Sequence, residues 1–206
     1  PAERICGKVA AVATGADRQT VTLAGGEAIS ARLLVLANGL NIALRHSLGM
    51  GRDNISPCHS VTLGFDLQPV GRPHFDFSSL THYSEEPRGR TAYLTLFPIG
   101  SAVRANFMVY RDLDDPWFRE FRHAPEAMLV AALPGLRRSL GAFEVTGPVK
   151  IRPADLYATT HYRQPGVVLV GDAFATSCPA AGTGAGKVLM DVERLCNVHI
   201  PRWLAS

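Results

Sequence analysis

The sequence predicts a mixed α/β fold, in which part of an open parallel sheet is combined with an antiparallel sheet and several helices. Apolar runs at residues 33–37 and 167–170 are typical of buried strands in a parallel sheet, and each ends at a glycine turn. Between them in the chain, residues 91–99 and 102–110 are two strong β runs separated by a short turn, which indicates an antiparallel hairpin. The chain is therefore expected to contain two different kinds of sheet.

The composition is that of an ordinary globular protein and argues against several classes of partner. Of the 206 residues, 47% are hydrophobic and 19% are charged, with a net charge of +3. The arginines are scattered without a dense basic stripe, so nucleic acid is not an expected partner. The four cysteines are widely spaced and form no CxxC pair, so neither a zinc site nor a disulfide framework is indicated. The sequence shows no signal peptide and no apolar run of membrane-spanning length, and a cytoplasmic location is expected.

The first part of the chain predicts a small antiparallel meander followed by the first parallel strand. Residues 5–13, 19–23 and 28–32 are short β-prone runs separated by glycine turns. The apolar run 33–37 comes next, and a short helix carrying Arg45 is expected after it.

The middle of the chain changes character and predicts an antiparallel sheet with helices. Residues 59–70 alternate as a strand, and the two β runs that follow them are joined at Gly100-Ser101. Asp114-Asp115-Pro116 is typical of a helix start, because acidic residues and proline favour the first turn. Further elements are expected as helices at 125–133 and 136–140 and as a strand at 145–154.

The stretch 166–195 is predicted to build a ligand site. Gly171-Asp172 follows the apolar strand, which places a carboxylate at the carboxyl end of a central strand, where open α/β sheets bind ligands. A helix is expected from about Thr183, with its N–H groups and positive dipole end facing the ligand. Glycines at every second position let a ligand approach the backbone: Gly182, Gly184 and Gly186. The helix is expected to carry its apolar residues on one face: Val188, Leu189, Val192 and Leu195.

Gly186-Lys187 superficially suggests a phosphate-binding P-loop. That motif needs a glycine five residues before the glycine of the Gly-Lys pair, and Ser or Thr directly after the lysine. The chain has Ala181 and Val188 at these positions, so the P-loop interpretation receives little support.

The same stretch resembles the second FAD-binding motif of the FAD-dependent aromatic hydroxylases, the para-hydroxybenzoate hydroxylase-like flavoprotein monooxygenases. The family pattern is matched with its spacing intact at Gly171-Asp172-Ala173, Pro179, Gly182-Thr183-Gly184, Asp191 and Leu195. The resemblance implies that FAD is the cofactor, with Asp172 on the ribityl chain and Pro179 and Gly182–Gly184 against the flavin ring. Two positions depart from many family members, which have His where this chain has Ala175 and Asn where it has Gly186.

A second segment resembles half of another motif of the same family, in which an apolar strand is followed by Asp-Gly, two residues, Ser, two residues and Arg. Gly39 and Arg45 match, whereas Asn38 replaces the Asp and Ile42 replaces the Ser. The resemblance implies that Arg45 lies on the phosphate side of FAD. An Asn-Gly turn without a cofactor role is an equally weighted interpretation.

The family begins with a strand, glycine loop and helix carrying GxGxxG, which this sequence lacks, and the chain starts at Pro1 rather than Met. We therefore expect a fragment without roughly the first hundred residues of a normal member. Residues 1–57 and 146–206 are expected to form part of a Rossmann-like FAD-binding domain, and residues 58–145 a substrate domain with an antiparallel sheet. The fragment alone is expected to be inactive, to bind FAD weakly, and to form a homo-oligomer or pair with the missing N-terminal segment.

By resemblance, the chain is part of an FAD-dependent monooxygenase that hydroxylates an aromatic or electron-rich small molecule with NADH or NADPH and O2. A flavin-dependent reductase or halogenase of the same fold remains open, as does a non-catalytic remnant that binds a partner. No acid–base residue is predicted, because each of these histidines is expected to be structural or solvent-facing: His59, His74, His82, His123 and His161.

Overall fold

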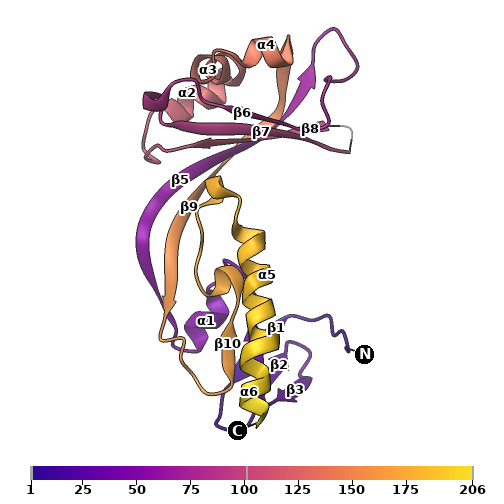
Figure 1. Cartoon of the computed structure of the whole chain (residues 1–206), viewed down its shortest axis with the longest axis vertical. Helices are drawn as coiled ribbons and strands as arrows, with labels where there is room; N and C mark the ends of the chain where they lie inside the picture. The colour runs from indigo at the N-terminus through magenta and orange to yellow at the C-terminus, as the bar shows by residue number, and fades with distance from the viewer. Residues whose placement is uncertain (1, 101, 206) are drawn as a thin grey trace. The chain divides into compact units, whose positions relative to one another are not determined.

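A computed structural model describes residues 2–100 and 102–205 and has the predicted mixture of α and β elements (Figure 1). The chain divides into two compact units. Unit 1 consists of Pro1–Ser56 and Leu156–Ser206, and unit 2 of Pro57–Asp155. Unit 2 is therefore a single stretch of chain between the two parts of unit 1.

Unit 1 begins with the predicted antiparallel meander. Its strands are β1 (Val9–Ala13), β2 (Gln19–Leu23) and β3 (Ala28–Ala31), and they are hydrogen-bonded in that order. The short strands and glycine turns of this segment match the sequence pattern, so the meander is confirmed.

A two-stranded parallel sheet follows from the two apolar runs. β4 (Leu34–Leu36) and β10 (Val167–Leu169) pair in parallel, with Val35 opposite Val168. This sheet contributes Leu36, Val167 and Leu169 to a small core, which Met50 and Ala173 complete. The expectation that β4 is buried throughout is wrong, because Val35 is 39% exposed on the opposite face.

The helices of unit 1 follow the two parallel strands. After β4 comes α1 (Ala43–Ser47), and after β10 come the 3-10 turns η2 (Gly171–Ala173) and η3 (Pro179–Ala181). The predicted C-terminal helix begins at Gly184 and continues as a series of helical elements (Figure 1): α5 (Gly184–Arg194), the π-helix η4 (Leu195–His199) and α6 (Ile200–Ala205).

The apolar face predicted for this helix is not buried. Only Leu195 is buried, whereas Val188, Leu189 and Val192 are exposed, Leu189 to 71%. An apolar stripe on a helix is normally buried by packing against another segment. Among the described residues, no segment covers the stripe of α5.

Unit 2 contains most of the third sheet, in which five strands lie in the order β6-β7-β8-β5-β9. The bounds are β5 (Gly51–Pro69), β6 (Leu80–Tyr83), β7 (Thr91–Ile99), β8 (Ala102–Val109) and β9 (Phe143–Thr160), with a 3-10 turn η1 (Pro87–Gly89). The predicted hairpin of β7 and β8 is confirmed, with Thr95 opposite Asn106. Ser101 of its predicted turn lies outside the described residues. β5 and β9 are longer than predicted, and β6 was not predicted.

Three helices cover one face of this sheet (Figure 1): α2 (Trp117–His123), α3 (Pro125–Ala132) and α4 (Leu136–Leu140). Alternate residues of β5, from Val61 to Leu67, are buried beneath them, as the period of two in a strand requires. The Asp115 carboxylate accepts a hydrogen bond of 2.9 Å from the Trp117 N–H, so the predicted acidic start of α2 is confirmed.

Candidate functional site

The turn after β10 contains a glycine whose backbone conformation and surroundings both disfavour a side chain. Gly171 has φ +61°, and a Cβ at this position would lie 2.8 Å from Cγ2 of Val188 on α5. Both the left-handed backbone and the contact therefore require glycine. Asp172 follows directly and is half-buried, so its carboxylate lies at the carboxyl end of a parallel strand, where the sequence places it.

Arg45 fixes this turn from α1. Its side chain is 1% exposed, and Nη1 donates to the carbonyl oxygens of Gly39 at 2.9 Å, Ala173 at 2.8 Å and Asp172 at 3.4 Å. Nη2 donates to the hydroxyl of Tyr157 at 3.3 Å. The guanidinium group thus joins the turn after β4 to the turn after β10. Its predicted position on the phosphate side of FAD stays a prediction, while the role that these contacts describe is structural.

The segment after the Gly-Asp turn is bonded to the end of β9. Thr159 donates from its hydroxyl to the carbonyl of Ala173 and from its N–H to the carbonyl of Phe174, both at 2.8 Å. Tyr157 donates its N–H to the hydroxyl of Thr176 at 2.9 Å, and the Thr176 N–H returns a bond of 3.0 Å. Residues 172–176 therefore have a backbone path fixed on one side by a strand.

The start of α5 offers unused hydrogen-bond donors. Gly182 has φ +64°, and a Cβ there would meet no atom within 4 Å, so the approach to the backbone is open. No side chain caps α5 in the described structure, and the Lys187 N–H is the one that bonds back to Thr183, at 2.9 Å. The N–H groups of residues 184–186 precede it and are the orphan donors of a helix start. This end of the helix fits the acceptor atoms of an anionic or carbonyl-bearing ligand.

An ion pair connects α5 to the Gly-Asp turn. The Asp191 carboxylate accepts from the Gly171 N–H at 2.9 Å and from the Lys187 ammonium at 2.8 Å, and Lys187 also donates to the Gly171 carbonyl at 3.2 Å. Burial by itself raises the pKa of Asp191, but the hydrogen bonds from Lys187 and Gly171 and the charges of Lys187 and Arg194 together hold that pKa below its ordinary value.

The Asp191 contacts predict a loss of stability in acid. Because the pKa is lowered on folding, the stabilisation is present above the unfolded-state pKa of about 3.9 and is lost as the pH falls through the lower folded-state value. Asp191→Asn is expected to lower the free energy of unfolding by about 1 kcal/mol at pH 7 and by less at pH 3. Urea denaturation at both pH values checks this, with Glu193→Gln on the same helix as control. Equal losses at both pH values would contradict it.

The predicted site residues fall into two groups in the structure. Gly171, Asp172 and Arg45 are brought together at the Gly-Asp turn by the hydrogen bonds of the arginine. Pro179 begins η3, and Gly182–Gly184 lead into α5. Their contacts with a cofactor stay predictions.

Sequence reasoning did not single out Tyr157 or the pairing of Lys187 with Asp191. The pairing had a local signal, because residues four apart on a helix are neighbours and opposite charges at that spacing attract. No local signal in the sequence indicates the contact of Tyr157, because its partner Arg45 lies 112 residues away in the chain.

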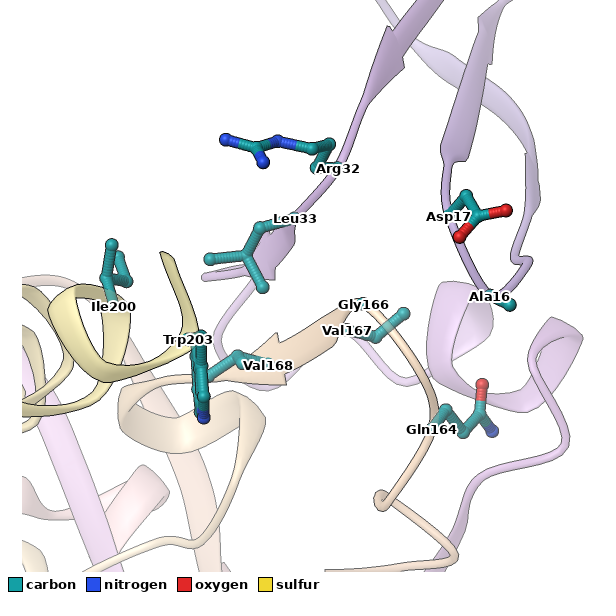
Figure 2. A pocket seen from close by; sticks show the side chains of 10 residues that line it. All are labelled: Ala16, Asp17, Arg32, Leu33, Gln164, Gly166, Val167, Val168, Ile200 and Trp203. Carbon is teal, nitrogen blue, oxygen red and sulfur yellow. The ribbon is translucent and has the colours of Figure 1, made fainter. Parts of the chain in front are cut away.

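A cavity of about 730 Å³ lies at the other end of the parallel strands and is distinct from the Gly-Asp turn (Figure 2). Leu33 precedes β4 and Gly166 precedes β10, so the cavity is at the amino ends of both strands. In Figure 2, Ile200 and Trp203 of α6 lie on one side and Asp17 of the meander on the other. Its size alone does not make it the candidate site, since ligands of open α/β sheets bind at the carboxyl ends.

Together, a carboxylate after a parallel strand and an uncapped helix start that follows a glycine turn are typical of binding sites of the dinucleotide-cofactor class. The chain matches the family described as FAD binding domain over residues 7–198, and it belongs to this family. The family and the FAD cofactor predicted from the Gly-Asp and Gly-x-Gly motifs are thereby confirmed.

Individual proteins are similar along most of the chain. It is 28% identical over 197 residues to 3-demethoxyubiquinol 3-hydroxylase of Escherichia coli (strain K12), covering 96% of this chain and 48% of that protein. Among solved structures, flavin-dependent brominase Bmp2 has a TM-score of 0.64 at 18% identity, over 89% of this chain and 47% of the other. p-Nitrophenol 4-monooxygenase PnpA from Pseudomonas putida DLL-E4 has a TM-score of 0.62 at 18% identity, over 91% and 46%. The chain thus spans about half the length of these relatives.

No helix among the described residues is long and apolar enough to cross a membrane.

Proposed function

We propose that this chain is part of an FAD-dependent monooxygenase that hydroxylates an aromatic or electron-rich small molecule with NADH or NADPH and O2. The observation that carries the proposal is the Gly-Asp turn fixed beside an uncapped, glycine-led helix start in a member of the FAD-binding family. The name of one relative, 3-demethoxyubiquinol 3-hydroxylase, supports hydroxylation in particular. This chain spans about half the length of its relatives. The activity is therefore proposed for the whole protein and not for this chain alone.

The residues divide the work of holding FAD. The Asp172 carboxylate accepts hydrogen bonds from the hydroxyl groups of the ribityl chain, and the N–H groups at the start of α5 donate to the pyrimidine end of the flavin ring. Pro179 and residues 182–184 form the surface against that ring, and Arg45 lies on the phosphate side. When bound, FAD would accept hydride and activate oxygen, while the protein orients the substrate and excludes water.

Residues 58–145, which lie within unit 2, are proposed as the substrate domain. Because Val61 to Leu67 alternate into the core, Asp66 and its neighbours lie on the face opposite the helices. Arg104 donates to the Asp66 carboxylate at 2.6 Å, and Asn106 lies opposite Thr95 on the same polar face. A sheet face with fixed polar groups is suited to orienting a small molecule.

Asp172→Ala is the direct test in the complete, FAD-loaded protein. Loss of a half-buried acceptor is expected to raise the FAD dissociation constant roughly tenfold, because a hydrogen bond to a charged group is lost. Flavin fluorescence titration measures this, and Asp17→Ala at the amino end of the strands is the control. An unchanged affinity for FAD in Asp172→Ala would contradict the proposed contact of Asp172 with the ribityl chain.

Product analysis separates the proposed reaction from its alternatives. Oxygen-dependent consumption of NADH or NADPH with insertion of a hydroxyl group supports the monooxygenase. Reduction without oxygen, or halide-dependent product, would replace it by a reductase or a halogenase. A complete protein that binds no FAD would favour the non-catalytic partner-binding alternative.

We also propose that the apolar surface of unit 1 pairs with another polypeptide segment, either in a homo-oligomer or as the N-terminal segment of the family. In the described residues, β4 is hydrogen-bonded along one edge only. Exposed apolar residues lie on α5, where Leu189 is 71% and Met190 58% exposed, and on α6, where Trp203 is 49% exposed. Open strand edges and apolar patches favour association.

Light scattering after size exclusion, read with flavin absorbance, tests this pairing on the 206-residue chain. A colourless oligomer is expected, because the chain alone is proposed to bind FAD weakly. A yellow monomer of 22.2 kDa would contradict both expectations.

A further inference from the structure

Tyr157 is a buried polar side chain whose contacts converge on the candidate site. It lies near the end of β9, is 2% exposed, and belongs to none of the motifs of the sequence. Two cations lie near its ring, with the guanidinium carbon of Arg52 at 4.4 Å and that of Arg45 at 5.8 Å from the ring centroid. These cation–π contacts hold the ring in one orientation.

The hydroxyl group of Tyr157 is aimed at the backbone of Asp172. It donates to the Asp172 carbonyl at 2.8 Å and accepts from Nη2 of Arg45 at 3.3 Å. Arg45 itself contributes only a longer bond, of 3.4 Å, to the same carbonyl. The tyrosine hydroxyl is therefore the nearer of the two donors on this oxygen.

Holding that carbonyl restricts the direction of the Asp172 side chain. The carbonyl group and the side chain branch from the same Cα, so a bond that fixes the carbonyl limits rotation about ψ. The preceding residue, Gly171, has no side chain to impose such a limit, and its φ is +61°. A glycine turn that must present a carboxylate in one direction thus relies on outside contacts.

We infer that Tyr157 is a positioning residue for FAD binding, which acts by fixing the Asp172 carbonyl and thereby the direction of its carboxylate. The inference rests on the proposed role of Asp172 toward the ribityl chain. Tyr157 itself makes no contact with FAD in this account, so its whole effect on FAD passes through Asp172.

A double-mutant cycle in the complete, FAD-loaded protein tests the inference. Tyr157→Phe removes the hydroxyl group and keeps the ring that contacts the two arginines. It is expected to raise the FAD dissociation constant roughly three- to tenfold, the range of one net hydrogen bond. In an Asp172→Ala background, the same change is expected to have less than about a twofold effect, because residues that act through each other are not additive. Tyr162→Phe is the matched control, since the described structure gives its half-buried hydroxyl no hydrogen bond.

The readouts are flavin fluorescence titration and the visible spectrum of bound FAD, with far-UV circular dichroism to confirm equal folding. If Tyr157→Phe binds FAD like Tyr162→Phe while Asp172→Ala binds it weakly, the inference is wrong and the proposed function stands. If the two effects multiply independently, Tyr157 acts by general packing and the inference is also wrong. If Asp172→Ala has no effect on FAD affinity, the proposed role of Asp172 is wrong, and the inference about Tyr157 that rests on it is wrong as well.

Discussion

Arg45→Ala is expected to lower the free energy of unfolding of unit 1 by about 3–5 kcal/mol, because it removes several buried hydrogen bonds and leaves a cavity in place of a large buried side chain. The carbonyls of Gly39 and Ala173 lose bonds of 2.9 and 2.8 Å, and the Asp172 carbonyl loses its longer one. The side chain is 1% exposed, so water has no access to replace it without local opening. The turns after β4 and β10 are expected to separate.

Hydrogen–deuterium exchange measures this effect with an internal reference. Peptides that cover β10 are expected to lose protection in Arg45→Ala, while peptides that cover β8 in unit 2 keep theirs. Arg45→Lys is expected to recover part of the loss, because an ammonium group reaches fewer acceptors than the planar guanidinium. Arg32→Ala, an exposed change in the same unit, serves as control. Protection of β10 equal to wild type in Arg45→Ala would refute the structural role.

Phe121→Ala is expected to destabilise unit 2 by about 3–5 kcal/mol, the usual cost of removing a large aromatic side chain from a core. Phe121 is 0% exposed, and its ring centroid lies 5.0 Å from that of Trp117, 5.7 Å from Phe65 and 5.8 Å from Phe107. Aromatic pairs at these distances add to the burial of apolar area. The cavity left by the change would open between α2 and the sheet.

Urea denaturation, followed by tryptophan fluorescence, tests the expected effect of Phe121→Ala on stability. In a Trp203→Phe background, Trp117 is the one remaining tryptophan and reports on the core that Phe121 occupies. Leu113→Ala, which changes a residue 52% exposed in the same unit, is expected to shift stability by no more than about 0.5 kcal/mol. A cost below about 1 kcal/mol for Phe121→Ala would mean that the cluster repacks.

Elements with a strong local pattern were predictable from the sequence. β7 alternates between buried and partly exposed residues from Leu94 to Phe97, and the two apolar runs that form β4 and β10 are short and rich in branched residues, as is typical of parallel strands. The Gly-Asp turn was predictable because its position after a strand is part of a motif with fixed spacing. These signals all lie within a few residues of the feature they predict.

Features that depend on distant partners were not predictable in the same way. The burial of Arg45 depends on carbonyls 127 and 128 residues away, which no local pattern describes. The apolar stripe of α5 predicts a buried face, but burial needs a covering segment as well as a stripe, and in the described residues Leu189 has none. The extension of β5 and β9 likewise reflects pairing within the sheet rather than their own alternation.

The strands that lead into and out of unit 2 are neighbours in one sheet. β5 passes from unit 1 into unit 2 at Ser56, and β9 returns at Leu156, and the two are adjacent in the strand order. Unit 2 is thus an inserted segment, here called a cassette, whose entry and exit strands are adjacent in one sheet. During evolution, or in the laboratory, such a cassette can be exchanged for that of a relative by joining two strand ends, without rerouting the chain that forms the Gly-Asp turn.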